Sequence, residues 1–320
     1  MNLNTLKPLG FACLMALGLA ACGGDKGVSG QAGGAASGAA AATKTENTLD
    51  KIKSSGTIVL GYRDASIPFS YIADNPNQPI GYAHDLQLKV VEAVKKQLNM
   101  PELKVRYNLV TSQNRIPLVV NGTVDFECGS TTNNVERQKQ VQFSNNFFVV
   151  GTRLLVDKAS GIKDFADLKG KPVVTTSGTT SERLLKEYND KNKAGMNIIS
   201  AKDHGEAFLM LQNGRAQAFM MDDVLLAGAR AKSADPAKWE IVGTPMSYEN
   251  YGCMMRKDDP EFQKVVNDAM NAVFKSDEIN TMYAQWFEKP IPPKNVNMEF
   301  PMSDKMKEII ANPNDKAADQ

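Results

Sequence analysis

The chain has 320 residues, 23% of them charged, and a formal net charge of +1 at pH 7. This near-neutral balance argues against nucleic acid or an acidic surface as the main partner. The part that follows position 47 is long enough for two lobes, each with its own hydrophobic core.

The first 21 residues have the pattern of a secretory signal. Lys7 supplies a basic start, and the apolar stretch 9–21 is too short to span a bilayer as a stable helix. The sequence Leu-Ala-Ala-Cys at 19–22 resembles a bacterial lipobox, which implies removal of residues 1–21 and lipidation of Cys22. An ordinary signal peptide with Cys22 unmodified is the alternative. Both interpretations take the protein across the inner membrane.

The segment that follows is rich in Gly, Ala, Ser and Thr. It lacks apolar periodicity, so it cannot bury enough surface to offset its ordering entropy. We therefore predict a flexible tether over residues 22–47.

The four cysteines divide by position. Cys13 leaves with the signal and Cys22 is assigned to lipid. Cys128 and Cys253 remain in an oxidising compartment, which predicts a disulfide between them, with two buried free thiols as the alternative. His84 and His204 lack the spacing of metal ligands, so no metal site is expected.

Strands and helices alternate along the rest of the chain. Short β-branched runs predict strands at 57–62, 105–110, 126–128, 149–156, 172–175, 197–201, 218–221, 239–242 and 251–256. Helical spacing and caps predict helices at 82–98, 112–120 (capped by Ser112), 134–140, 182–191, 204–212, 224–232, 260–275 and 279–287. Regular structure is expected to end at 290–293. This alternation predicts an α/β protein with two open sheets joined by strands.

Polar clusters follow several of the predicted strands. They are TSQNR at 111–115, GSTTNN at 129–134, SGTTS at 177–181, Asp203-His204 and Asp222-Asp223. Ligands of open α/β sheets bind at the carboxyl ends of strands and at helix N-termini. We therefore expect these clusters to line one cleft.

From about Asn47 onward the chain resembles the periplasmic glutamate/aspartate-binding proteins of bacterial ABC importers, which are family 3 solute-binding proteins. The matching segments include GYRDASIPFSY, TSQNRIPL, DFECGSTTNNVERQKQ, VVTTSGTTSE, GRAQAFMMDD and YGCMMRKDDP. TSQNR and FECGSTTN are the narrow ones and indicate the acidic amino-acid subgroup. The resemblance implies a type II clamshell, with one lobe from 48–150 plus 252–320 and the other from 151–251.

The resemblance also implies a set of ligand-binding residues. In the family pattern the α-carboxylate is bound by Arg137, supported by Ser130 and Thr132, and the α-ammonium by Asp222. Arg63 and Arg115 are expected to bind a side-chain carboxylate, with Ser112 positioning the ligand. Thr180 and His204 are expected to contribute from the second lobe, His204 as a donor to a carboxylate.

Each of these residues has a structural alternative. The arginines could be solvated surface cations, and Asp223 rather than Asp222 could face the cleft. His204 could simply cap its helix. Phe69 and Tyr71 could line the cleft or belong to the core.

The predicted function is binding of L-glutamate or L-aspartate by closure of two lobes, followed by delivery to an ABC permease in the inner membrane. We expect a monomer in the periplasm or cell envelope, anchored by lipid, without a cofactor. A periplasmic cyclohexadienyl or arogenate dehydratase on the same fold is the alternative. Such an enzyme needs an additional acid or base in the cleft, for which Glu127 and Glu136 are the candidates.

Overall fold

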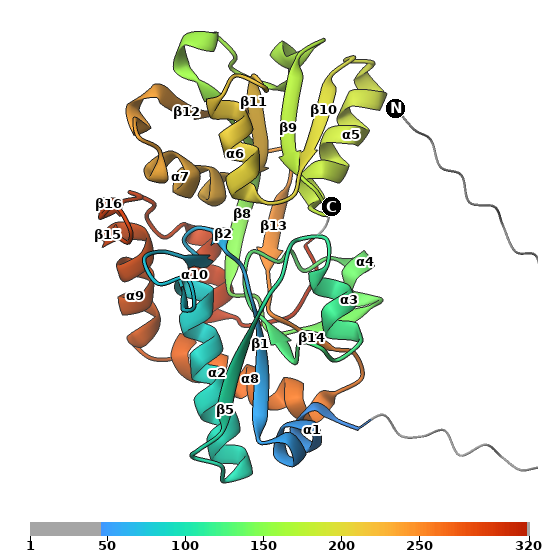
Figure 1. The fold of residues 1–320 in the computed structure, drawn as a ribbon, viewed down its shortest axis with the longest axis vertical. Coiled ribbons are helices and arrows are strands. Elements are labelled where there is room, and N and C mark those ends of the chain that lie inside the picture. Colours follow the sequence, from blue (N-terminus) through green and yellow to red (C-terminus); the bar gives the residue numbers. More distant parts are fainter. Residues whose placement is uncertain (1–45, 319–320) are drawn as a thin grey trace, which may run out of the picture. The chain divides into compact units, whose positions relative to one another are not determined.

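The computed structural model describes residues 46–318 (Figure 1). The predicted signal peptide, the lipidation site Cys22 and nearly all of the predicted tether lie outside the described residues. Residues 45–320 form a unit of their own. The described part begins with α1 (Thr48–Ser55), whose N-cap Asn47 accepts a hydrogen bond from the backbone of Asp50.

One lobe is built on a five-stranded sheet in the order β5-β1-β6-β14-β7. Its strands are β1 Thr57–Tyr62, β5 Lys104–Leu109, β6 Phe126–Glu127, β7 Val141–Phe143 and β14 Met254–Arg256. β1 is parallel to β5 and β6, whereas β14 is antiparallel to β6 and β7. We call this part the first lobe. Its remaining elements are α1, α2 (Tyr82–Leu98), α3 (Arg115–Val120), α4 (Val135–Gln138), α8 (Pro260–Phe274), α9 (Glu278–Tyr283), a π-helix (Ala284–Glu288), α10 (Asp304–Ala311), and the small strands β2 (Ala65–Ser66), β3 (Ser70–Ile72), β4 (Pro79–Ile80), β15 (Pro290–Ile291) and β16 (Val296–Asn297).

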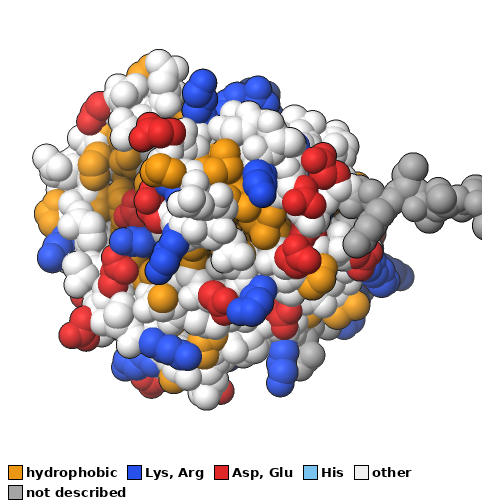
Figure 2. All heavy atoms as spheres, turned by 90° about the horizontal axis from the view of Figure 1, so that it is seen from below, with side chains coloured by type: hydrophobic (Ala, Val, Ile, Leu, Met, Phe, Trp, Pro, Cys, Tyr) orange, Lys and Arg blue, Asp and Glu red, His pale blue; other side chains and the backbone are white. Residues whose placement is uncertain are grey.

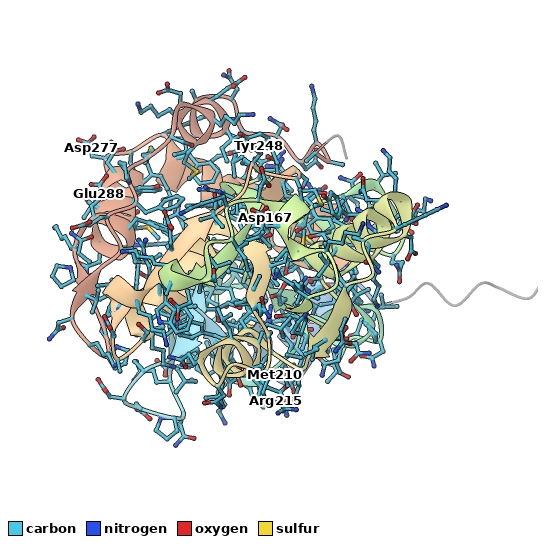
Figure 3. The ribbon with its side chains drawn as sticks, turned by 90° about the horizontal axis from the view of Figure 1, so that it is seen from above. Asp167, Met210, Arg215, Tyr248, Asp277 and Glu288 are labelled. Atoms are coloured by element: carbon cyan, nitrogen blue, oxygen red, sulfur yellow. A yellow bond between two sulfur atoms is a disulfide. The ribbon has the colours of Figure 1, made fainter. Side chains whose placement is uncertain are left out.

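The second lobe is built on a sheet in the order β10-β9-β11-β8-β12, with β13 paired to β8. Its strands are β8 Phe148–Asp157, β9 Pro172–Thr176, β10 Asn197–Ala201, β11 Ala218–Asp222, β12 Trp239–Val242 and β13 Tyr248–Tyr251. Its helices are α5 (Thr180–Asn192), α6 (His204–Gln212) and α7 (Asp223–Lys232), with short 3-10 turns at Lys158–Ser160, Phe165–Leu168 and Pro236–Lys238. In Figure 3, Met210 and Arg215 mark the end of α6, at the edge of this view opposite to Asp277 and Glu288.

Two strands connect the lobes and lie side by side. β8 and β13 are antiparallel neighbours, with Tyr251 opposite Phe148 and Tyr248 opposite Gly151. Figure 1 shows both strands running from one lobe to the other. The predicted fold, two α/β lobes joined by a pair of strands, is therefore confirmed.

Aromatic side chains gather where the connecting strands meet the first lobe. The ring of Phe148 lies 4.8 Å from that of Phe69 and 4.9 Å from that of Phe287, centroid to centroid. Phe69 and Tyr71 are both fully buried, so they belong to the core and do not line the cleft. The buried apolar cluster continues from these rings into the second lobe through Val224 and neighbouring residues. Figure 2 shows acidic, basic and hydrophobic side chains interspersed over the face seen from below.

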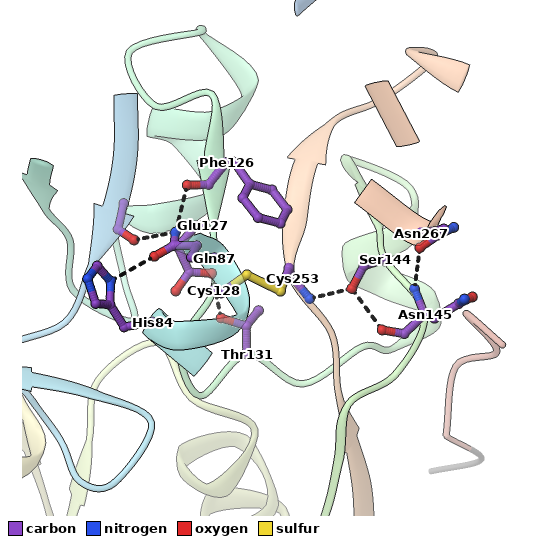
Figure 4. Close-up of a disulfide and its surroundings, with 11 residues drawn as sticks. His84, Gln87, Phe126, Glu127, Cys128, Thr131, Ser144, Asn145, Cys253 and Asn267 are labelled. Carbon is purple, nitrogen blue, oxygen red and sulfur yellow. Dashed lines mark hydrogen bonds between the residues drawn. A yellow bond between two sulfur atoms is a disulfide. The ribbon is translucent and has the colours of Figure 1, made fainter. Parts of the chain in front are cut away.

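The predicted disulfide is present between Cys128 and Cys253 (Figure 4). Cys128 directly follows β6 and Cys253 directly precedes β14, so the bond joins two neighbouring strands of the first lobe. The backbone N–H of Cys253 also donates to the hydroxyl of Ser144, at 2.9 Å. The start of β14 is thus fixed to the first lobe immediately after β13.

The prediction of a single strand at 251–256 is wrong. β13, which pairs with β8, ends at Tyr251. The chain then passes through Gly252 and Cys253 and pairs with β6 and β7 as β14. The N–H of Gly252 donates to the carbonyl of Thr131 instead of to a strand partner. Because the buried run from Tyr251 to Met255 is continuous, the sequence pattern does not reveal the change of sheet.

Two predicted helices are shorter than expected. The helix expected at 112–120 begins at Arg115 and its N-cap position is Asn114; Ser112 is not its cap, because its hydroxyl accepts from Arg63 Nη2 at 3.0 Å. The polar helix expected at 134–140 is only Val135–Gln138, with Asn134 as the capping residue.

Regular structure does not end at 290–293, because β15, β16 and α10 follow there. The last described residues then lie on the first lobe. Backbone carbonyls of the C-terminal tail accept hydrogen bonds from two buried asparagines, Asn133 Nδ2 to Asp315 at 2.9 Å and Asn146 Nδ2 to Lys316 at 2.9 Å. The tail therefore supports the segment that leads into α4.

Candidate functional site

Three buried arginines of the first lobe converge near its boundary with the second lobe. Arg63 follows β1, Arg115 begins α3 and Arg137 lies in α4; each side chain is at most 8% exposed. Within the described part of the chain, no carboxylate forms an ion pair with any of the three. Arginine at such sites usually binds an anion through its planar set of donors.

Neutral groups hold the guanidinium groups in place. Arg63 donates to Ser112 Oγ at 3.0 Å and to Ser130 Oγ at 3.4 Å. Arg115 donates to the carbonyl of Ser130 at 2.8 Å and to Thr131 Oγ1 at 2.5 Å. The Nε atoms of Arg63 and Arg115 are buried without a hydrogen-bond partner. The first lobe thus orients these two cations while leaving donors unsatisfied.

Arg137 reaches toward the second lobe. Its guanidinium donates to the carbonyl of Thr132 at 2.9 Å and to the carbonyl of Gly178 in the second lobe at 3.4 Å. Asn134 caps α4 by accepting from the N–H of Arg137 at 2.9 Å, which fixes the start of that short helix. The predicted residues Ser130 and Thr132 lie in the same buried segment.

Burial makes positive charge costly here. Burial, together with repulsion from Arg115, lowers the pKa of Arg63 to about 10 and that of Arg137 to about 9. Burial also lowers the pKa of Arg115. All three remain cations at neutral pH, so this part of the molecule favours an anion.

From the second lobe, His204 faces Arg63. Its Nε2 lies 3.5 Å from Arg63 Nη2 and its Nδ1 lies 2.8 Å from Thr176 Oγ1. Burial, followed by repulsion from Arg63 and Arg115, lowers the pKa of His204 well below its usual value, so the ring is neutral. Because guanidinium has only donors, this contact fits a ring with its proton on Nδ1 and an accepting Nε2. Donation from His204 to a carboxylate was expected without a choice of ring nitrogen, and donation through Nε2 requires the other tautomer.

Asp222 ends β11 and is the acidic group of the second lobe that faces the site. It accepts hydrogen bonds from the hydroxyl of Tyr251 and, at 3.4 Å, from Ser181 Oγ. Burial raises the pKa of Asp222 well above its usual value, and the nearby Glu249 raises it further. Its neighbour Asp223 instead accepts from the N–H of Val224 at 2.8 Å. The two adjacent acids therefore have different environments.

Two buried glutamates were not predicted as binding residues. Glu249 on β13 accepts from Thr132 Oγ1 at 2.5 Å and from Thr180 Oγ1 at 2.7 Å. Glu127 on β6 accepts from Thr131 Oγ1 at 2.8 Å. Sequence reasoning missed Glu249 because β13 was not predicted. The signal was a charged residue between aromatic ones in the run Tyr-Glu-Asn-Tyr at 248–251.

The two lobes are in close contact around the site. A Cβ atom added at Gly178 would lie 2.7 Å from the Cα of Gln113, and one added at Gly228 would lie 2.5 Å from the carbonyl oxygen of Ile67. Arg137 and Thr180 border an opening of about 660 Å³ between α4 and the start of α5. This arrangement buries the polar groups of both lobes against each other.

Among residues 46–318, no group of three or more His, Cys, Asp or Glu side chains could hold a metal ion. None of the helices in this range is sufficiently long and apolar to cross a membrane.

Several solved structures share this architecture. An ancestral arginine-binding protein bound to arginine is 28% identical, with a TM-score of 0.64 over 72% of this chain and 98% of that one. An ancestral amino acid-binding protein that is a precursor of cyclohexadienyl dehydratase is 29% identical, with a TM-score of 0.64 over 75% of this chain and 99% of that one.

Two curated relatives are much more similar in sequence. The L-glutamate/L-aspartate-binding protein of Pseudomonas aeruginosa is 66% identical over 87% of this chain and 92% of that protein. The glutamate/aspartate import solute-binding protein of Escherichia coli is 59% identical over 87% of this chain and 91% of that protein. Residues 58–289 match the model of the bacterial extracellular solute-binding proteins, family 3, and the chain belongs to this family.

Proposed function

We propose that this protein binds L-glutamate or L-aspartate between its lobes and delivers it to the permease of an ABC importer. The observation that carries the proposal is the charge pattern of the site. Three buried guanidinium groups without ionic partners lie across from the buried carboxylate of Asp222, within the described residues. An amino acid with two carboxylates and one ammonium group complements that pattern.

Each group of the ligand has an assigned partner. Arg137, next to the N-terminus of α5, binds the α-carboxylate, where helix N–H groups add further donors. Asp222 accepts from the α-ammonium. The side-chain carboxylate lies against Arg63 and Arg115, and the remaining predicted residues of this subsite are Ser112, Ser130 and His204.

The relatives support this ligand class. Those at 66% and 59% identity are named for glutamate and aspartate, whereas a glutamine-binding protein of Bacillus subtilis is only 28% identical.

The relatives at high identity are transport proteins, so a dehydratase activity is not favoured. The acids nearest the site also have structural partners: Asp222 accepts from Tyr251, and Glu127 from Thr131.

The lobes are proposed to move as units of residues 48–150 plus 252–320 and of residues 151–251. Their boundaries fall within β8 and just after β13, the two connecting strands. A hinge needs only a few residues at such positions to change their backbone angles. The close approach of Gly178 to Gln113 corresponds to the closed form.

The N-terminal part is proposed to anchor the protein. The lipobox pattern ending at Cys22 supports cleavage before that residue and attachment of lipid to its thiol. Residues 22–47 then link the lipid to the binding domain, which works as a monomer at the periplasmic face of the cell envelope.

The first prediction concerns selectivity. Purified protein, freed of bound ligand by unfolding and refolding, is expected to bind L-glutamate and L-aspartate tightly in calorimetric titration. L-Glutamine should bind at least about 100-fold more weakly, since an amide cannot pair with two buried guanidinium groups. Tight binding of L-glutamine would overturn the roles of Arg63 and Arg115.

The same titration tests Arg137. Replacement by alanine should weaken L-glutamate binding by about 100-fold or more, because the α-carboxylate then enters a buried site without its cation. Arg215→Ala, at an exposed position past α6, is the matched control and should bind as the wild type does.

The second prediction concerns closure. Gly228→Ala places a methyl group 2.5 Å from the carbonyl oxygen of Ile67 across the lobes, so it should weaken L-glutamate binding about tenfold. Alanine is also the better helix former, by about 1 kcal/mol. Thermal unfolding of the ligand-free variant should therefore be unchanged or shifted upward, and unchanged affinity would contradict closure at this contact.

The third prediction concerns pH. A carboxyl whose pKa is raised by folding stabilises the folded state fully below its unfolded pKa of about 4 and loses this contribution as pH rises through its folded pKa. Ligand-free Asp222→Asn lacks this titration. Because burial raises the pKa of Asp222, the wild type loses stability between pH 5 and pH 8 that the variant does not lose. The free energy of unfolding of the variant minus that of the wild type, measured in urea, should therefore be larger at pH 8 than at pH 5 by at least about 1 kcal/mol.

The exposed acid Asp268 offers a control for that series, since its side chain is 64% exposed. Asp268→Asn should differ from the wild type by the same amount at both pH values. A pH-independent difference for Asp222→Asn would show that Asp222 titrates normally.

The fourth prediction concerns the anchor. Mass spectrometry of the mature protein from its native membrane should find Cys22 as the first residue, carrying a diacylglyceryl group. An unmodified Cys22, or an N-terminus elsewhere, would exclude the lipoprotein proposal and leave the binding function unaffected.

A further inference from the structure

Glu249 is a buried acid with no role in the site proposed so far. It is fully buried on the connecting strand β13, with Val150 of β8 as its strand neighbour. Within the described residues, none of the ion pairs involves Glu249. Its Oε1 accepts from Ser247 Oγ at 3.2 Å. Glu249 attracts Arg137 and Arg115 at longer range, opposing the fall in their pKa values, but it has no directly paired cation. A buried carboxylate of this kind is costly, and a ligand that supplies a cation would offset that cost.

The other oxygen of Glu249 joins the two lobes. Oε2 accepts from Thr132 Oγ1 of the first lobe at 2.5 Å and from Thr180 Oγ1 of the second lobe at 2.7 Å. Distances of this size are typical of hydroxyl hydrogen bonds to a charged oxygen. Both threonines can reach one oxygen of Glu249 only while the lobes are together.

These contacts determine whether each hydroxyl can donate or accept a further hydrogen bond. A threonine hydroxyl has one hydrogen and two lone pairs. Because Thr132 and Thr180 both give that hydrogen to Glu249, neither has one for a ligand carboxylate. Their oxygens lie 3.5 Å apart and can act only as acceptors. One ammonium nitrogen could lie at hydrogen-bond distance from both.

We propose that Glu249 is a positioning and specificity residue, which turns Thr132 and Thr180 into acceptors and, with Asp222, makes the closed cleft select an α-ammonium group. This inference rests on the proposed function and deepens it. It also revises the roles expected for the two threonines, from donors to a carboxylate to acceptors from the ammonium. Glu249 acts at the hinge and through hydroxyls contributed by each lobe, so the selection is completed on closure.

The test compares two ligands that differ only at the α-position. L-Glutamate carries an ammonium group there, and (S)-2-hydroxyglutarate carries a hydroxyl with the same two carboxylates. In Glu249→Gln, L-glutamate affinity should fall about 10- to 100-fold, whereas affinity for the hydroxy acid, measured by competition in the millimolar range, should change less than about threefold. If Glu249 had only a structural role, its replacement would lower the affinity for both ligands by the same factor, and that result would overturn the proposal.

Further variants keep the test decisive. Glu240→Gln, at a partly exposed position on β12, is the matched control and should leave both affinities unchanged. If Glu249→Gln does not fold, Thr180→Val removes one acceptor at constant shape and should weaken L-glutamate alone. Equal weakening of both ligands in Thr180→Val would mean that this hydroxyl serves a carboxylate. Failure of the wild type to bind L-glutamate would instead refute the proposed function itself.

Discussion

The structure depends on holding like charges close together in a buried place. Burial weakens the hydration of Arg63, Arg115 and Arg137 and lowers the pKa of all three, and repulsion from Arg115 contributes to the lower pKa values of Arg63 and Arg137. The protein could neutralise them with its own acids, yet these acids accept mainly from hydroxyls, as Glu249 does from two threonines. Hydroxyls and carbonyls orient the cations without cancelling their charge. The unsatisfied electrostatic energy is therefore available to a ligand.

The connecting strands place these charges with respect to one another. β8 carries Thr152 opposite Asp222 of β11, while β13 carries Glu249 and then Tyr251, whose hydroxyl donates to Asp222. A movement at β8 and β13 therefore acts directly on the acidic side of the site. The disulfide attaches the chain to the first lobe at Cys253, two residues beyond Tyr251. In this way β13 carries both one strand of the proposed hinge and Glu249, the residue proposed to orient the ammonium acceptors.

Much of this organisation could be predicted from the sequence, and its failures have physical reasons. Long periodic elements such as 82–98 and short β-branched runs such as 239–242 were found because one pattern covers each of them. The break at Gly252 was missed because Tyr251 on one side and Cys253, Met254 and Met255 on the other are all buried, so hydrophobicity does not reveal that the chain changes sheets there. β15 and β16 were missed because two-residue strands leave no periodic signal. α10 did carry a signal, since Ser303 caps it and Met306, Ile309 and Ile310 have helical spacing, but this signal was overlooked.

The site residues were selected from motifs, and the structure brings the nine of them together, but the direction of their hydrogen bonds could not be read from motifs. Thr180 at a helix N-terminus suggests a donor to an anion. Its actual partner, Glu249, comes from a strand 69 residues later in the chain. Similarly, the contacts of His204 with Arg63 and Thr176 are defined only in the folded chain. The types of the site residues were therefore predictable, whereas the donor or acceptor role of each side chain depends on neighbours distant in sequence.

The same fold binds ligands of different charge, so selectivity must lie in few side chains. An ancestral arginine-binding protein bound to arginine shares the architecture at a TM-score of 0.64. In the present chain a cationic side chain would enter a subsite that already holds Arg63 and Arg115, where like charges in a buried setting cost several kcal/mol. A neutral amide would leave both guanidinium groups without a counter-charge, which is also costly, though less so. A carboxylate alone relieves the repulsion that the fold maintains, and the length of the ligand's side chain then matters less than its charge.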